Sequence, residues 1–121
     1  AVAGKWDHEK EFATLAKDCG FDEYCIWPQW LHARLAKKLA LPKNDAWHRY
    51  WDFNTVQNGE PLKPGEDDWG PEVRMRFLMD FARRHKDRPF FLYVPHAYVH
   101  HPRGAAALPP GGHGARSADP E

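Results

Sequence analysis

Apolar residues recur at helical spacing in three stretches of this chain, which predicts helices over residues 9–19, 30–40 and 71–86. In the first stretch, Gly20 suits the C-terminal end of the helix. Because Cys19 falls on the apolar face, we expect it to be a buried free thiol. The apolar positions of this stretch follow an i, i+3, i+4, i+7 pattern and are Phe12, Leu15, Ala16 and Cys19.

The helix predicted over residues 71–86 carries the clearest signals. Pro71 suits its first turn, and basic residues crowd its last turn, where positive charge meets the negative end of the helix dipole. We expect its apolar stripe to face the core. That stripe consists of Val73, Phe77, Phe81 and Ala82, widened by Met75, Leu78 and Met79.

Extended segments are predicted on either side of these helices. Residues 1–6 indicate the end of a buried strand that runs into a loop. Residues 90–94 form a continuous apolar run, which is typical of a strand buried on both faces. Residues 50–62 are expected to be extended around a hairpin turn at Asn58-Gly59, and residues 63–68 to form a surface loop.

A helix that leads directly into a buried strand is half of a βαβ crossover, so the pattern predicts an α/β fold with parallel strands. In such sheets, sites form beyond the carboxyl ends of the strands. Lys5 lies just past one predicted strand end, and His96, His100 and His101 lie just past another. We therefore expect these residues to converge on one edge of the sheet.

Composition narrows the choice of partners. The 121 residues suit one modest domain, and 17 basic residues balance 17 acidic ones, so the formal net charge is zero. This removes the electrostatic argument for a nucleic-acid or membrane-surface partner. Two cysteines do not define a disulfide scaffold, and no apolar run approaches the roughly 20 residues of a transmembrane helix. Residues 103–121 are rich in Gly, Pro and Ala and are expected to be a disordered tail.

Each residue that could carry chemistry is, on its own, only weak evidence for a functional site. Lys5 could bring an ammonium to a bound oxyanion, although alone it is better read as a surface lysine beside an aromatic residue. The three histidines could bind a metal or act as a general acid, but Pro95 and Pro102 disfavour the helix that their spacing would need for metal binding. Two acidic pairs in turn-like contexts could suggest a metal site, although loop solvation and helix N-terminal charge explain Asp67-Asp68 adequately. These pairs are Asp22-Glu23 and Asp67-Asp68.

Taken in order, several short motifs over residues 1–102 resemble the sulfatases of the alkaline phosphatase superfamily, in particular an arylsulfatase-like bacterial branch. The first two are Ala1-Val2-Ala3-Gly4-Lys5-Trp6 and Gly20-Phe21-Asp22-Glu23-Tyr24-Cys25. The middle ones are Arg49-Tyr50-Trp51-Asp52, Gln57-Asn58-Gly59 and Gly70-Pro71-Glu72-Val73. The last are Asp87-Arg88-Pro89-Phe90-Phe91-Leu92-Tyr93-Val94-Pro95 and His100-His101-Pro102.

The resemblance implies a partial parallel-sheet sandwich and a sulfuric ester hydrolase. In that family the lysine of Gly-Lys-Trp contacts the sulfate, which corresponds to Lys5. A histidine after the Phe-Phe-Leu-Tyr strand contacts the sulfate and the leaving oxygen, which corresponds to His100, with His101 as the adjacent alternative. The implied mechanism uses a formylglycine nucleophile and a calcium ion on a small-molecule or carbohydrate sulfate ester. A periplasmic or secreted location is typical of the family.

The chain also departs from the family pattern. The Cys/Ser-x-Pro-x-Arg nucleophile motif is absent, no residue corresponds to the metal-binding aspartates, and Asp7 stands where many relatives have histidine. We therefore expect residues 1–102 to be an internal fragment of a sulfatase catalytic domain that is inactive alone. The alternatives left open are a phosphodiesterase or phosphonate hydrolase of the same superfamily, a non-catalytic remnant, and a histidine-rich metal-binding module.

Overall fold

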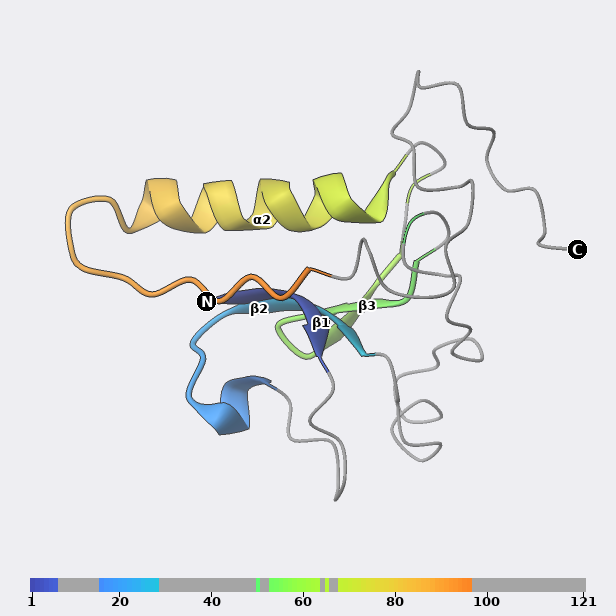
Figure 1. The fold of residues 1–121 in the computed structure, drawn as a ribbon, viewed down its shortest axis with the longest axis horizontal. Helices are drawn as coiled ribbons and strands as arrows, with labels where there is room; N and C mark the ends of the chain where they lie inside the picture. Colours follow the sequence, from blue (N-terminus) through green and yellow to red (C-terminus); the bar gives the residue numbers. More distant parts are fainter. Residues whose placement is uncertain (7–15, 29–49, 51–52, 64, 66–67, 97–121) are drawn as a thin grey trace, which may run out of the picture.

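The computed structural model describes residues 1–6, 16–28, 50, 53–63, 65 and 68–96. Their elements, in chain order, are β1 (Val2–Trp6), the 3₁₀ helix η1 (Ala16–Cys19), β2 (Tyr24–Pro28), β3 (Thr55–Gln57), β4 (Glu60–Leu62) and α2 (Gly70–Arg84). The four strands form one sheet in the order β1-β2-β3-β4. Figure 1 shows α2 on one side of this sheet and η1 on the other.

The segment that follows α2 extends the sheet beyond β1. Tyr93 bridges Val2 in parallel, its N–H donates to Ala1 O at 3.0 Å, and its carbonyl accepts from the Ala3 N–H at 3.0 Å. Lys5 N–H donates to Pro95 O at 2.8 Å, so the pairing continues to the end of β1. Residues 91–95, which we call the edge segment, therefore lie beside β1 as a further extended strand, drawn in orange in Figure 1.

The α/β class is confirmed, but the sheet is mixed rather than parallel. Only β1, β2 and the edge segment run in one direction, whereas β3 is antiparallel to both β2 and β4. The turn between β3 and β4 is the predicted one, with Asn58 at φ 50° and Gly59 at φ 96°. Two consecutive positive φ angles close a two-residue hairpin, and a hairpin pairs its strands antiparallel.

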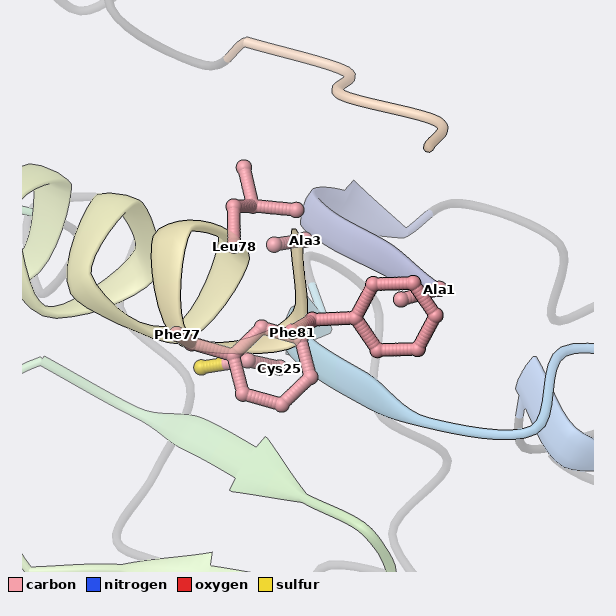
Figure 2. Packing of buried hydrophobic residues seen from close by; sticks show 6 residues of the cluster. All are labelled: Ala1, Ala3, Cys25, Phe77, Leu78 and Phe81. Carbon is pink, nitrogen blue, oxygen red and sulfur yellow. The ribbon is translucent and has the colours of Figure 1, made fainter. Parts of the chain in front are cut away.

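The sheet has an apolar core on each face because side chains alternate along its strands. On the α2 face, two small residues, one before β1 and one in it, let the helix approach closely. The cluster there is Ala1, Ala3, Cys25, Phe77, Leu78 and Phe81, drawn in Figure 2, with Leu92 and Val94 packed against it. The opposite face is covered from η1 and the turn after it. Its cluster is Val2, Trp6, Ala16, Tyr24, Ile26 and Val56, with Phe21 packed against it.

Helix α2 begins and ends close to the prediction of residues 71–86, and Pro71 stands in its first turn. Its buried stripe differs from the predicted one. Met75 and Met79 were predicted to widen the stripe, but they are 44% and 47% exposed. Both lie further around the helix than Leu78, on the side turned away from the core. Arg74, which the apolar pattern passed over, is buried instead.

The edge segment is not buried on both faces as predicted. Leu92 and Val94 pack toward α2, but Phe91 is 68% exposed and Tyr93 is 42% exposed. On their side the ring of Phe21 stacks on both, with centroids 6.2 Å and 6.3 Å away. An apolar run therefore marks a strand without fixing what covers it.

The prediction that the Cys19 thiol is buried is wrong. Cys19 is exposed, whereas Cys25 on β2 is fully buried. The reason is the chain reversal at Gly20 (φ 91°), where Phe21 N–H donates to Ala16 O and Gly20 N–H to Lys17 O. This Schellman arrangement ends the helix at Gly20 as predicted, and it turns Phe21, rather than Cys19, against the core.

Several predictions fall outside the described residues. They concern the helix over 30–40, most of the helix over 9–19, and the tail at 103–121. Within the ranges that the structure does describe, no helix combines the length and apolarity needed to cross a membrane.

The two cysteines should react at very different rates with a thiol reagent such as Ellman's reagent. Burial raises the pKa of the Cys25 thiol to about 11, and thiolate is the reactive form, so only Cys19 should react quickly in the native protein near pH 8. Denaturant should release the second thiol. Cys19→Ser should abolish the fast phase, and fast labelling that persists in this variant would contradict the burial of Cys25.

Candidate functional site

Lys5 stands at the carboxyl edge of β1, beside the end of the edge segment. Its backbone N–H bonds the Pro95 carbonyl, and its side chain is partly exposed. His96 follows Pro95 directly and is exposed. The predicted convergence is therefore confirmed for Lys5 and His96, while His100 and His101 lie outside the described residues.

Gly4 makes this close approach possible. It adopts φ +136°, and a Cβ added there would lie 2.1 Å from Pro95 O and 2.9 Å from Pro95 C. Both neighbours are backbone atoms, which cannot swing aside as a side chain can. The glycine of Gly-Lys-Trp thus has a structural role, because it lets the end of the edge segment touch β1 next to Lys5.

A row of residues crosses the sheet at this edge. Lys5 on β1 is in register with Trp27 on β2, and the antiparallel register that pairs Ile26 with Val56 brings Thr55 of β3 opposite Trp27. Trp27 and Thr55 are both fully buried. By the alternation of side chains along strands, this row faces α2.

Arg74 reaches this row from the first turns of α2. It is only 3% exposed, its Nη2 donates to Thr55 Oγ1 at 3.2 Å, and its guanidinium lies 5.6 Å from the centre of the Phe53 ring. An arginine stays protonated in proteins, so this end of the sheet holds a fixed positive charge. The sequence did carry a signal for it, since Arg74 lies three and seven residues before Phe77 and Phe81 on one helix face.

Further buried donors lie beside these groups in the chain. Asn54, just before Thr55, is 4% exposed, and its Nδ2 is buried without a hydrogen-bond partner among the described residues. The same holds for Nε1 of Trp69, the residue that precedes α2. Gly70 N–H, in contrast, already donates to Tyr50 O at 2.6 Å. A buried donor without a partner among the described residues calls for a polar group from a ligand or from another part of the chain.

One acidic residue of each pair, Glu23 and Asp68, is held by basic or backbone partners. Glu23 accepts two hydrogen bonds from Arg84, and Asp68 accepts from the Gly65 N–H and from Arg76. The described residues include no group of three or more His, Cys, Asp or Glu side chains that could hold a metal ion. They therefore do not provide the calcium site that the sulfatase resemblance implies for the complete protein.

A groove of about 870 Å³ opens at the opposite, amino edge of the sheet. Four phenylalanines contribute to its wall, and Lys5, the residue of the predicted site that the structure describes, is not among the described lining residues. The described lining residues include Phe21, Phe81, His85, Phe90 and Phe91. Its volume alone does not make it the site of chemistry, because the cationic groups considered above lie at the other edge.

An ionic cluster at the amino edge ties the start of β2 to the end of α2. Arg84 donates to both carboxylate oxygens of Glu23, at 2.8 Å and 2.6 Å, and to Asp80 at 2.7 Å. His85 Nε2 lies 3.4 Å from Glu23 Oε1. The Arg84 hydrogen bonds hold the pKa of the Glu23 carboxyl below its usual value, with a smaller contribution from His85.

Comparisons with known proteins supply no relative. A scan against protein-family models, a search of curated proteins and a search of solved structures found no match. The function of the carboxyl edge must therefore be inferred from its own residues and from the motifs that they belong to.

Replacing Gly4 should disrupt the junction between β1 and the edge segment. Gly4→Ala should destabilise the fold by on the order of 3 kcal/mol or more, measured by urea unfolding, because its Cβ would collide with the Pro95 backbone. Gly65→Ala is the matched control, since its Cβ would meet only the flexible Asp68 side chain at 3.1 Å. Equal stability of the two variants would contradict the close contact at Gly4.

Glu23 should make stability depend on acid pH. Because its folded-state pKa is lowered, its contribution is present above the unfolded-state pKa and is lost as the pH falls through the folded-state value. Glu23→Gln should thus lower the thermal midpoint near neutral pH and change it little near pH 2. The effect should be small because the pair is partly exposed. Glu60→Gln, an exposed carboxylate on β4, is the control and should show no such difference.

Proposed function

We propose that this chain is part of the catalytic domain of a sulfatase, an enzyme that hydrolyses sulfate esters. The observation that carries the proposal is the 2.8 Å hydrogen bond from Lys5 N–H to Pro95 O. It joins Gly4-Lys5-Trp6 to the end of Phe90-Phe91-Leu92-Tyr93-Val94-Pro95. In the sulfatases that the sequence resembles, residues at or just after these two motifs act on the same sulfate group.

The fold supports this proposal in outline. Three neighbouring extended segments, the edge segment, β1 and β2, run parallel, and α2 crosses over one face between β4 and the edge segment. A sheet of this kind forms its site at the carboxyl edge, where Lys5 lies. We propose that these parallel segments belong to the central sheet of an alkaline phosphatase-type sandwich, with the β3–β4 hairpin as a local antiparallel addition.

The charges at the carboxyl edge fit a sulfate ester. A bound sulfate monoester carries a negative charge on its non-bridging oxygens, and further charge develops on the bridging oxygen as the ester bond breaks. Lys5 supplies an ammonium that is partly exposed and can reach a ligand. Arg74 is buried and donates to Thr55, so no contact with the ester is assigned to it. The proposal gives Lys5 the role of binding the sulfuryl oxygens.

The remaining roles follow from the resemblance. We assign His100 to the sulfate and to the leaving oxygen, where an imidazole can donate a proton to the departing alcohol, with His101 as the neighbouring choice. The formylglycine nucleophile and the calcium ion would come from parts of the complete protein that this sequence does not include. The described residues do not form a calcium site.

The ester itself is a small-molecule or carbohydrate sulfate. Trp27, which neighbours Lys5 across the sheet, is fully buried, so its ring packs in the core and is not available to stack on a sugar. The aromatic residues of the described carboxyl edge therefore do not distinguish a sugar sulfate from an aryl sulfate. We base the substrate class on the sulfate group alone.

Removing the Lys5 ammonium should impair the complete enzyme. In the full-length protein that contains this segment, Lys5→Ala should lower kcat/KM for 4-nitrophenyl sulfate by on the order of 100-fold, because a charge-stabilising donor is lost. Lys17→Ala is the matched control, since Lys17 is exposed on η1, on the opposite side of the sheet (Figure 1), and should leave activity unchanged. The 121-residue chain alone should show no turnover, and turnover that Lys5→Ala abolishes would contradict its fragment character.

The same assay separates related chemistries. Equal assays on sulfate monoesters, phosphate diesters and phosphonate esters should show a preference for sulfate. A preference for either phosphorus ester would replace the sulfatase proposal by a phosphodiesterase or phosphonate hydrolase. Unchanged activity in Lys5→Ala would remove Lys5 from the site altogether.

A further inference from the structure

A chain of polar contacts leads from the turn after α2 to the start of β2. Arg88 Nε and Nη2 lie 3.2 Å and 2.8 Å from His85 Nδ1. On the other side of the ring, His85 Nε2 lies 3.4 Å from Glu23 Oε1. His85 is therefore the middle member of the chain, with a polar partner at each ring nitrogen, and it is also the C-terminal cap residue of α2.

This geometry selects one protonation state of His85. A guanidinium has only donors, so Nδ1 must accept from Arg88 and cannot itself carry a proton. The single proton of the neutral ring then lies on Nε2, which faces the Glu23 carboxylate. The Phe81 ring, with its centroid 4.3 Å from that of the imidazole, packs against His85 and helps to hold this orientation.

A second proton on His85 would break its contact with Arg88. The proton would bind at Nδ1, where it replaces an acceptor by a donor and sets two positive charges at hydrogen-bond distance. The contact of Nε2 with Glu23 would remain and would become an ion pair. Protonation thus removes one of the two ring contacts and strengthens the other.

The surrounding charges decide which side chain moves. Glu23 favours the protonated ring and Arg84 opposes it, but Arg84 is already bonded to Glu23 and Asp80. Arg88 is exposed and bonds no carboxylate among the described residues, so it can turn into solvent when His85 gains a proton. The other charged groups of the groove and of the turn form no hydrogen bond or ion pair with His85, and are the Ala1 amino group, Asp22, Lys86 and Asp87.

We propose that His85 is a pH-sensitive switch that controls the turn over residues 85–88. When the ring is neutral, Arg88 is held against the end of α2. When the ring is protonated, Arg88 is released, while Glu23 keeps His85 in place. Because Arg88 and Phe90 both line the groove at the amino edge, the switch sets whether this guanidinium is fixed beside His85 or free to turn into the groove. This inference does not depend on the proposed enzymatic function.

Nuclear magnetic resonance of the 121-residue chain tests the proposal at about pH 8 and about pH 5, which bracket the range in which histidines change charge. Long-range nitrogen–proton spectra at the higher pH should show His85 as the tautomer protonated at Nε2. Carbon-detected spectra follow the rotation of the Arg88 guanidinium, which should be at least about tenfold faster at the lower pH, because two hydrogen bonds are lost. Arg76, paired with Asp68 at the other end of α2, is the internal control and should rotate equally at both pH values.

His85→Gln removes the titrating ring and should abolish the pH response of Arg88, with folding checked by circular dichroism. If the 121-residue chain does not fold, the same spectra are recorded on the full-length protein with labelled histidine and arginine. A neutral His85 ring protonated at Nδ1 would overturn the proposal without any variant. Equal rotation of Arg88 at both pH values would also overturn it. A response that persists in His85→Gln would do the same, since another group would then be responsible.

Discussion

The parallel pairing of β1 with the edge segment is the constraint on which the rest of this structure depends. It is made through Tyr93, which bonds on both sides of Val2, and through Lys5, whose N–H meets Pro95. The pairing closes the crossover from β4 through α2 and thereby holds the helix over the sheet. It also fixes which residues share the carboxyl edge. Without this pairing, the described contacts would not hold Lys5 beside Pro95 and His96.

Small residues let the helix and the sheet meet at this pairing. Ala1 and Ala3 give α2 room to approach, and Phe77, Leu78 and Phe81 fill the space between helix and sheet (Figure 2). Ion pairs reinforce the amino edge, where Arg84 binds Glu23, while the carboxyl edge carries Lys5 and Arg74 with an excess of donors. The amino edge thus contributes stability through its ion pairs, while the carboxyl edge holds the lysine of the Gly-Lys-Trp motif.

The sequence predicted features set by local chemistry and missed features set by their surroundings. The hairpin at Asn58-Gly59 and the turn at Gly20 were predictable, because positive φ angles select these residues whatever lies around them. The convergence of Lys5 with His96 followed from the rule for parallel strands. The exposure of Phe91 was not predictable, since an apolar run says nothing about which partners cover it.

The candidate site was predicted only in part for related reasons. Lys5 stood out because it follows a glycine at a strand end. Arg74 did not stand out, because a charged residue beside an apolar stripe is normally expected to be exposed to solvent, whereas the structure shows it buried. The structural need for Gly4 was also hidden, since the Pro95 backbone that approaches it comes from far along the chain. His100 and His101 remain predictions, as they lie outside the described residues.

The contact between Ala1 and Phe91, 90 residues apart in the chain, has a consequence for how the protein folds. Segments this distant in sequence meet slowly, because the entropy cost of closing a long loop precedes the stabilising contacts. The β3–β4 hairpin and α2 can form from local interactions as soon as they are synthesised. During synthesis on the ribosome, β1 emerges well before its outer neighbour at residues 91–95, so its apolar side chains stay available to chaperones until that segment is made.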